Sequence, residues 1–200
     1  MQRDFKKDDF ARFLARSNAV RFGDFTLKSG KKSNIFFDFG QLFYGKELAA
    51  LGGYFADFIV SGNLADIDVL FGPAYKGINI ALAVSIALHE RHGLSIPFAY
   101  NRKIIKDHAE GGKFVGFELA KARTALILDD VFTDGGTKYE VIDMLSGFKQ
   151  LAIKAMLVGV DRQEVDDSGK PHLSIFTRRT GIQVFALTTK EDVLAARGKR

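Results

Sequence analysis

Residues 125–137 read Ala-Leu-Ile-Leu-Asp-Asp-Val-Phe-Thr-Asp-Gly-Gly-Thr, and this stretch decides the fold. Its four apolar residues predict a short buried strand over 125–128, followed at once by two carboxylates, Asp129 and Asp130. A glycine-rich loop comes next, and a helical pattern begins at Lys138. In open α/β sheets, ligands bind beyond the carboxyl ends of the strands, where such a loop and a helix N-terminus present N–H groups to an anion. The stretch therefore offers acceptors for hydroxyl groups and donors for a phosphate, which is what a sugar phosphate requires.

Each part of this stretch also has a purely structural interpretation. An Asp-Asp pair after a strand is often a solvated loop start, and Gly-Gly is often only a turn. The stretch is not a Walker A loop, because no Gly-Lys-Ser/Thr follows, and it lacks the Gly-x-Gly-x-x-Gly dinucleotide fingerprint. The whole pattern is far more specific than its parts: it resembles the motif with which type I phosphoribosyltransferases bind 5-phosphoribosyl 1-diphosphate (PRPP).

Short apolar runs alternate with helical patterns along most of the chain. Their alternation predicts an α/β fold with a mostly parallel central sheet flanked by helices. We expect one domain over 1–200, with a small N-terminal hood over about 1–45 and an α/β core over 46–200. The hood should hold a helix over 5–19 and two strands at 25–27 and 35–39. In the core we expect strands at 69–71, 96–100, 125–128, 155–160 and 183–187, and helices at 46–60, 77–92, 138–148, 172–179 and from about 191.

Composition excludes several classes of function. The chain has no cysteine, so it has no disulfide framework and no thiolate metal site, which fits a cytoplasmic location. Its start is polar, unlike a signal peptide, and its longest apolar stretch, 78–88, is too short to span a bilayer. The net charge of +5 fits an anionic small substrate, and no Arg-rich repeat or zinc finger favours nucleic acid. We therefore expect neither a membrane nor a nucleic acid as partner.

Two further segments bring charge toward the same edge of the sheet. Residues 72–77, Gly-Pro-Ala-Tyr-Lys-Gly, follow the strand at 69–71 and carry Lys76, a compact charge suited to a phosphate. The alternative is an exposed lysine at the start of a helix. Residues 101–113 interleave basic and acidic residues and contain Gly111-Gly112. A charge run is usually a solvated face, but a basic loop of this length is also typical of a lid over a polyanionic leaving group.

These segments together resemble the orotate phosphoribosyltransferases. The resemblance spans about 22–164 and is carried by four groups of residues. They are residues 71–77; residues 100–103 with Lys106-Asp107-His108 and Glu110-Gly111-Gly112; residues 25–30 with Ser33, Phe36 and Phe37; and Asp161-Arg162-Gln163-Glu164. The lid separates this family from purine phosphoribosyltransferases, which share the Asp-Asp motif.

The resemblance implies a type I phosphoribosyltransferase fold and a pentosyltransferase of pyrimidine (UMP) biosynthesis. Such an enzyme converts orotate and PRPP into orotidine 5′-phosphate and pyrophosphate. It further implies Mg²⁺, held mainly through PRPP and water rather than by protein ligands. A homodimer with shared active sites is also implied, because Lys103 matches a residue that acts in the neighbouring subunit's site.

The same resemblance assigns individual roles. The catalytic residues would be Arg102, Lys103, Lys106, His108, Asp129 and Asp130. PRPP would be bound by these six and by Lys28, Tyr75, Lys76, Val131, Phe132, Thr133, Asp134, Gly135, Gly136 and Thr137. Orotate would be bound by Phe36, Phe37, Thr133 and Arg162.

Two alternatives stay open at this point. One is an enzyme of the same fold that uses another base, such as a purine or uracil; Arg162 argues against it, because a neutral base needs no arginine. The other is a regulator that keeps the PRPP fold and binds RNA or DNA through its basic surface. Such a regulator would no longer need the lid residues, and here the set is complete.

Overall fold

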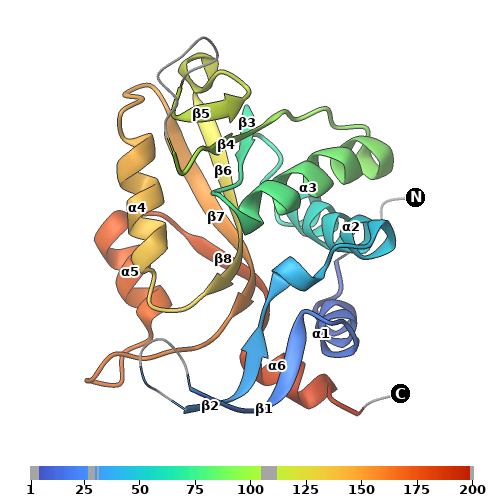
Figure 1. The fold of residues 1–200 in the computed structure, drawn as a ribbon. Helices are drawn as coiled ribbons and strands as arrows, with labels where there is room; N and C mark the ends of the chain where they lie inside the picture. Colours follow the sequence, from blue (N-terminus) through green and yellow to red (C-terminus); the bar gives the residue numbers. More distant parts are fainter. Residues whose placement is uncertain (1–4, 27–29, 31, 105–111, 199–200) are drawn as a thin grey trace.

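A computed structural model describes residues 5–26, 30, 32–104 and 112–198. Within this part, six strands form one sheet in the order β5-β4-β3-β6-β7-β8, and every neighbouring pair except β4 and β5 is parallel (Figure 1). This confirms the predicted mostly parallel sheet. The strands are β3 (Val69–Phe71), β4 (Phe98–Asn101), β5 (Phe114–Gly116), β6 (Thr124–Phe132), β7 (Ala152–Asp161) and β8 (Val184–Thr189).

The strand order places a switch point between β3 and β6. From β3 the chain first builds outward through β4 and β5, and it then returns to the other side of β3 with β6, β7 and β8. The loops after β3 and β6 therefore leave their strands in opposite directions. Such a divergence opens a crevice at the carboxyl ends of the strands, which is where ligands bind in folds of this class.

Helices cover both faces of the sheet, as Figure 1 shows. On one face lie α2 (Gly45–Ser61) and α3 (Lys76–His92), and on the other α4 (Gly136–Leu145) and α5 (His172–Thr180). Of two short 3₁₀ helices, η1 (Phe39–Gln41) joins β2 to α2, and η2 (Leu119–Lys121) joins β5 to β6. Because both faces are covered, the strands are apolar on both sides, which explains why their sequences are short continuous apolar runs.

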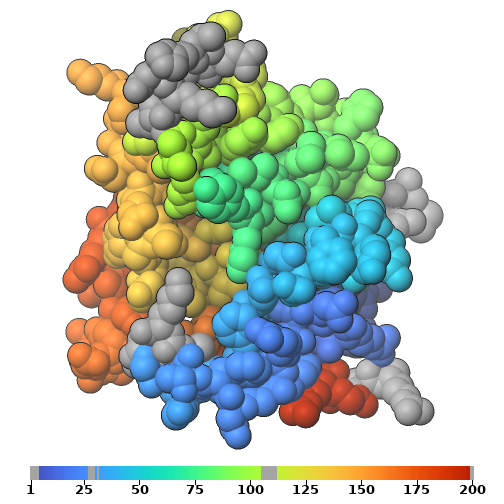
Figure 2. All heavy atoms as spheres, viewed as in Figure 1, coloured from blue at the N-terminus to red at the C-terminus, as the bar shows by residue number. Residues whose placement is uncertain are grey.

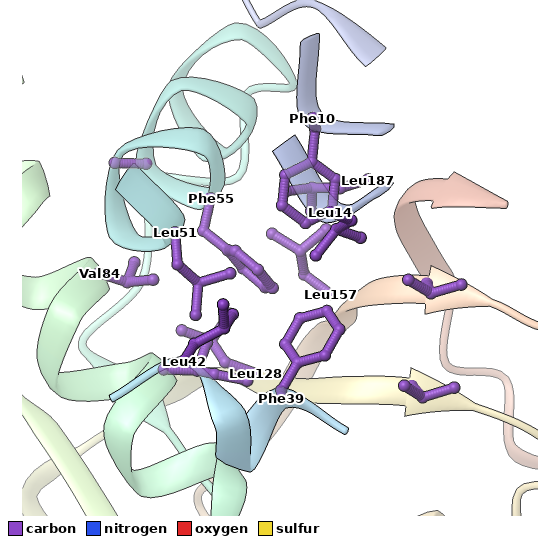
Figure 3. Close-up of a cluster of buried hydrophobic side chains, with 14 of the residues drawn as sticks. Phe10, Leu14, Phe39, Leu42, Leu51, Phe55, Val84, Leu128, Leu157 and Leu187 are labelled. Atoms are coloured by element: carbon purple, nitrogen blue, oxygen red, sulfur yellow. The ribbon is translucent and has the colours of Figure 1, made fainter. Parts of the chain in front are cut away.

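The N-terminal segment shares the main hydrophobic core with the sheet. Helix α1 (Lys7–Arg16) contributes Phe10 and Leu14, both fully buried. Figure 3 shows them meeting side chains from η1 and its C-cap, from α2 and α3, and from the sheet, namely Phe39, Leu42, Leu51, Phe55, Val84, Leu128, Leu157 and Leu187. The C-terminal helix α6 (Lys190–Ala196) packs on α1, and the Lys7 ammonium pairs with Asp192 at 2.7 Å.

The hood contains the two expected strands, but their bounds differ. Strands β1 (Val20–Thr26) and β2 (Lys32–Phe37) form a separate antiparallel pair, with Val20 opposite Phe37 and Thr26 opposite Lys32. The first strand therefore starts five residues before the predicted start at 25. The start was missed because the segment before residue 25 is not a continuous apolar run: it contains Arg21, Gly23 and Asp24. Strand pairing depends on backbone hydrogen bonds, which these residues can still form.

Three further boundaries correct the sequence analysis. Strand β6 continues through Phe132 instead of ending at 128, because it pairs with β7 along its whole length, including Asp129 with Val158. Helix α4 starts at Gly136, two residues before the predicted start. The edge strand β5 was not predicted at all, since three residues ending in glycine carry no strand pattern. Of the predicted lid, residues 105–111 lie outside the described part of the chain. No helix among the described residues is long and apolar enough to cross a membrane.

Candidate active site

The loop over 72–77 lies tightly against the end of β6. A Cβ on Gly72 would lie 2.1 Å from the Gly77 carbonyl oxygen, and one on Gly77 would lie 3.0 Å from that of Leu128, so side chains at both positions would collide with backbone. The buried Asn101, at the end of β4, accepts a hydrogen bond from the Ala74 N–H at 2.9 Å. The Ala74–Tyr75 peptide bond is cis. These contacts fix the loop at the crevice, where the Tyr75 side chain is 69% exposed.

Asp129 and Asp130 lie on opposite faces of β6, as successive residues of a strand do. Asp129 faces α4 and its carboxylate contacts Lys138, whereas Asp130 faces α3 and contacts Lys76. The sequence pattern predicted that the strand ends before the two carboxylates. Because the strand extends past them, each has its own environment and its own lysine.

Asp129 is almost completely enclosed. Its Oδ2 accepts a hydrogen bond from the Lys138 ammonium at 2.6 Å, and its Oδ1 accepts one from the Asp130 N–H at 2.9 Å. Burial raises the pKa of Asp129 above its ordinary value, and the neighbouring Asp130 adds to this, while the charge of Lys138 opposes it. Asp129 and Lys138 therefore lie at ion-pair distance in a buried position behind the strand end.

Asp130 belongs to a larger and more exposed network. The Lys76 ammonium lies 3.1 Å from Asp130 Oδ2 and 3.2 Å from Asp38 Oδ1, so it joins the core to the hood. Partial burial acts to lower the pKa of Lys76, but the two carboxylates outweigh it and raise that pKa. For Asp38, burial acts to raise the pKa, but Lys76, Gln41 and the Gly40 N–H lower it overall. Lys76 and Asp38 are therefore both charged at neutral pH.

The loop between β6 and α4 has the geometry of an anion site. Gly135 adopts the left-handed conformation, with φ at 83°, and its carbonyl accepts hydrogen bonds from the N–H groups of Lys138 and Tyr139. The Gly136 N–H donates to Asp134 Oδ1 at 3.0 Å, which is the main reason the pKa of Asp134 is lowered. The first N–H groups of a helix have no partner within it, and its dipole favours an anion at that end. Both features favour an anion at the N-terminus of α4.

Two residues predicted to bind PRPP have side chains in the core instead. Val131 is 9% exposed, and Phe132 is fully buried, with its ring 5.4 Å from that of Phe176. Any contact of these two residues with PRPP would therefore have to come from their backbone. Thr133, Asp134, Gly135, Gly136 and Thr137 follow them at the end of β6 and the start of α4.

Arg162 lies directly after β7 and connects the core to the hood. Its N–H donates to the Phe132 carbonyl, and its Nη2 donates to Ser33 Oγ at 3.3 Å. Its Nε lies 3.3 Å from Glu164 Oε1, yet among the described residues this buried nitrogen has no partner with hydrogen-bond geometry. The residue is only 8% exposed. A buried arginine with one nitrogen left over is suited to bind a carboxylate with its planar fork.

The two predicted orotate-binding phenylalanines are separated by the alternation of β2. Phe37 is 6% exposed and belongs to the main core. Phe36 is half-buried on the opposite face, where its ring lies 5.6 Å from that of Phe25 and beneath the Arg21 guanidinium. The structure therefore does not bring the two rings together on one wall.

The lid residues and the hood lysine are only partly described. Lys28, Lys106 and His108 lie outside the described residues. Arg102 is half-buried, with its N–H donating to the Lys113 carbonyl at 2.7 Å, and Lys103 is exposed. The structure thus places these two residues at the base of the predicted lid.

Three residues of the site had no role in the sequence analysis: Asp38, Asn101 and Lys138. Asp38 directly follows the Phe-Phe pair, and Asn101 belongs to the segment that carries the family resemblance, but neither position revealed its partner. Lys138 had a weak signal, since it lies within one helical turn of the Gly-Gly loop. A lysine there is usually assumed to be solvated, so the contact with Asp129 was not expected.

Comparison with known proteins agrees with this geometry. The sequence model described as "Phosphoribosyl transferase domain" matches residues 45–192. Orotate phosphoribosyltransferase of Bifidobacterium adolescentis is 38% identical over 94% of this chain and 84% of its own length, and that of Haemophilus influenzae is 40% identical over 94% and 86%. The crystal structure of orotate phosphoribosyltransferase from Francisella tularensis superposes with a TM-score of 0.79 at 33% identity, covering 94% of this chain and 88% of the other. The chain therefore belongs to the orotate phosphoribosyltransferase family.

Proposed function

We propose that this chain transfers the ribose 5-phosphate group of PRPP to orotate, giving orotidine 5′-phosphate and pyrophosphate in pyrimidine biosynthesis. The observation that carries the proposal is the position of two carboxylates, Asp129 and Asp130, at a strand end beside the N-terminus of α4. That arrangement offers acceptors and anion donors in one crevice, in a chain whose relatives have this activity in their name.

The reaction exchanges one bond for another at the anomeric carbon of the ribose. The orotate ring nitrogen forms a bond to this carbon and loses its proton, which water or the departing pyrophosphate takes up. The bond to the pyrophosphate oxygen breaks with its electron pair leaving on pyrophosphate. Positive charge develops on the sugar during the exchange, as in other glycosyl transfers. Asp129 and Asp130 would accept hydrogen bonds from the ribose hydroxyls and stabilise that charge, while the N–H groups of residues 133–137 would hold the 5′-phosphate.

Lys76 would stabilise the leaving pyrophosphate. Its ammonium is bound to two carboxylates, yet its side chain is 42% exposed at the crevice, so it can reach a phosphate without leaving a buried position. The exposed Tyr75 and the lid residues Arg102, Lys103, Lys106 and His108 would complete this part of the site. Lys28 would reach PRPP from the hood.

Arg162 would bind the carboxylate of orotate. Its guanidinium already lies between Ser33 of the hood and Glu164, and its buried Nε has no hydrogen bond within the described part of the chain. A charge-assisted pair with a carboxylate would satisfy it. Thr133 and Phe36 would lie along the orotate ring, and Phe37 would support the hood from within the core.

Magnesium fits this site as a substrate-borne ion rather than as a protein-bound one. Within residues 5–26, 30, 32–104 and 112–198, no three His, Asp or Glu side chains gather closely enough to hold a metal. Asp129 and Asp130 each already have a lysine partner. Mg²⁺ prefers oxygen ligands and retains waters, so PRPP oxygens and water would hold it, and it would neutralise charge on the pyrophosphate. The carboxylates would then accept hydrogen bonds from its waters.

We further propose that the enzyme is a cytoplasmic homodimer with shared active sites. Apolar side chains are exposed along α3 and before α2: Leu82 at 44%, Ile86 at 50%, Phe43 at 59% and Tyr44 at 57%. Helices α2 and α3 pack together and form the outer surface at the right of Figure 2. A second copy would cover this surface, and the exposed Lys103 could then act in the neighbouring site.

Mixing two inactive variants tests the shared sites. Lys103→Ala and Asp129→Ala should each be nearly inactive alone, whereas a heterodimer can contain one site with neither change. Mixing the two should therefore restore activity under conditions in which subunits exchange. If exchange is demonstrated and no activity returns, the sites are not shared.

The reaction itself is tested by the loss of orotate ultraviolet absorbance. Purified protein should consume orotate only when PRPP and Mg²⁺ are both present. Turnover of adenine or hypoxanthine with orotate inert would contradict the proposal and assign the chain to another base.

A further inference from the structure

Lys138 is a buried lysine whose charged end meets the carboxylate of Asp129. Its side chain is 8% exposed, and its Nζ lies 2.6 Å from Asp129 Oδ2, itself on a side chain that is 12% exposed. A lysine is rarely buried unless it is paired, because removing its charge from water is costly. The pair therefore needs a reason beyond the stability of the fold.

The position of Lys138 excludes the role that Lys76 has in the proposed reaction. Lys76 is 42% exposed and has two carboxylate partners, so it can turn toward a substrate phosphate. Lys138 lies behind Asp129, enclosed between β6 and α4. It is the third residue of α4. It is placed to act on Asp129 rather than on a ligand.

The surroundings of Asp129 show what would happen without this lysine. Burial and the neighbouring Asp130 both raise the pKa of Asp129, and among the described residues Lys138 is the charge that opposes them. A protonated aspartic acid carries no negative charge for a developing sugar cation, and it offers fewer acceptor sites for ribose hydroxyls.

We propose that Lys138 is a positioning residue of the transfer reaction: its ammonium keeps Asp129 ionised and fixes the orientation of the carboxylate toward the ribose of PRPP. Oδ2 is held by Lys138 and Oδ1 by the Asp130 N–H, so the plane of the carboxylate is set before substrate arrives. Each oxygen retains a further lone pair for a ribose hydroxyl. The part of this inference that concerns ribose rests on the proposed function, whereas the ionisation of Asp129 does not.

The test compares four variants of the full-length protein. Lys138→Met removes the charge and the hydrogen bond, Lys138→Gln removes only the charge, and Lys138→Arg keeps both. Val141→Ala is the matched control, because Val141 is an uncharged residue buried on the same helix. If Lys138→Met does not fold, the Gln and Arg variants still separate charge from structure.

Two measurements are made on each variant without orotate. The first is the titration of the Asp129 carboxyl by ¹³C NMR, assigned with Asp129→Asn. The second is the dissociation constant of PRPP as a function of pH. Lys138→Met and Lys138→Gln should raise the titration midpoint of Asp129 by about one pH unit or more. At the pH of that midpoint both variants should bind PRPP about twofold to tenfold more weakly than the wild type, and binding should recover at higher pH. Lys138→Arg should resemble the wild type, and Val141→Ala should lower only the melting temperature.

A different outcome would overturn the inference. If Lys138→Gln lowers the melting temperature while the Asp129 midpoint and PRPP binding stay at wild-type values, Lys138 is a structural residue only. Failure of the proposed function would look different: the wild type would not consume orotate, yet the carboxyl titration would still decide the role of Lys138.

Discussion

The two faces of β6 carry the same chemical pair, aspartate with lysine, in different surroundings. On the α4 face, Asp129 and Lys138 are 12% and 8% exposed, and among the described residues they have only each other as ion-pair partners. On the α3 face, Asp130 is 14% exposed, but its partner Lys76 is 42% exposed and also binds Asp38 of the hood. The first pair is enclosed, whereas the lysine of the second pair is exposed enough to exchange a carboxylate partner for a substrate anion.

This difference separates what is fixed in the site from what can move. An enclosed pair interacts more strongly, because little water screens it, and it holds its geometry before substrate binds. An open pair contributes less to stability but can exchange one anion for another as pyrophosphate forms and leaves. One dipeptide, Asp129-Asp130, thus supplies both kinds of group because β6 continues through it.

The largest effect should come from removing the carboxylates themselves. Asp129→Asn and Asp130→Asn should each lower kcat/KM for PRPP by on the order of 10²–10³-fold, as expected when one preorganised electrostatic group is lost. The loss should be greater for Asp129, because its charge acts in the drier environment. Steady-state kinetics with PRPP varied measure both, with the exposed Asp143→Asn of α4 as control. A greater loss at Asp130 would reverse the ordering that enclosure predicts.

A smaller effect is expected from the open lysine. Lys76→Met should lower kcat about 10- to 100-fold, because the leaving group loses one cation of several. Its matched control is Lys154→Met, which removes a lysine of β7 whose Nζ donates to the Asp66 carbonyl at 2.9 Å. Equal activities of the two variants would show that Lys76 only ties the core to the hood.

The smallest effect should be a pH-dependent change in stability at Asp38. The fold lowers the pKa of Asp38 below the ordinary value of 3.8, so its carboxylate is favoured in the folded state. That contribution is present above pH 3.8 and is lost as the pH falls through the lower folded pKa. Asp38→Asn should therefore cost up to about 1 kcal/mol of unfolding free energy at pH 7, and the cost should vanish in acid.

Chemical denaturation at several pH values measures this difference. Asp24→Asn, an exposed aspartate on β1 of the same hood, is the control and should show no such dependence. A cost at Asp38 that is the same at pH 3 and pH 7 would mean that the charge of the residue has no part in it.

The sequence predicted the elements whose signal is local. The apolar run Val69–Phe71 marked β3 without error, and the helical pattern after it marked α3 to within one residue. The bounds of β6 were wrong because two carboxylates end an apolar run without ending a strand. Backbone pairing with β7 carries the strand past them, and no property of the side chains reveals that pairing.

The site was predictable in its residue types but not in its contacts. The family resemblance named Asp129, Asp130 and Lys76, and the structure brings Lys76 to Asp130. The pairing of Lys138 with Asp129 was not readable, because a lysine in a helix is ordinarily solvated. The contact between Arg162 and Ser33 could not be predicted either. The two residues are 129 positions apart in the sequence, and their contact depends on how the hood packs on the core.

Binding of orotate through Arg162 is tested most directly by the Michaelis constant for orotate in Arg162→Ala. Loss of a desolvated charge-assisted pair of about 2–4 kcal/mol predicts an increase of roughly 30- to 1,000-fold. The constant for PRPP should stay near that of the wild type, as both should in the exposed control Arg178→Ala. A lower melting temperature with an unchanged orotate constant would contradict the claim, because Arg162 would then only hold Ser33 and Glu164 in place.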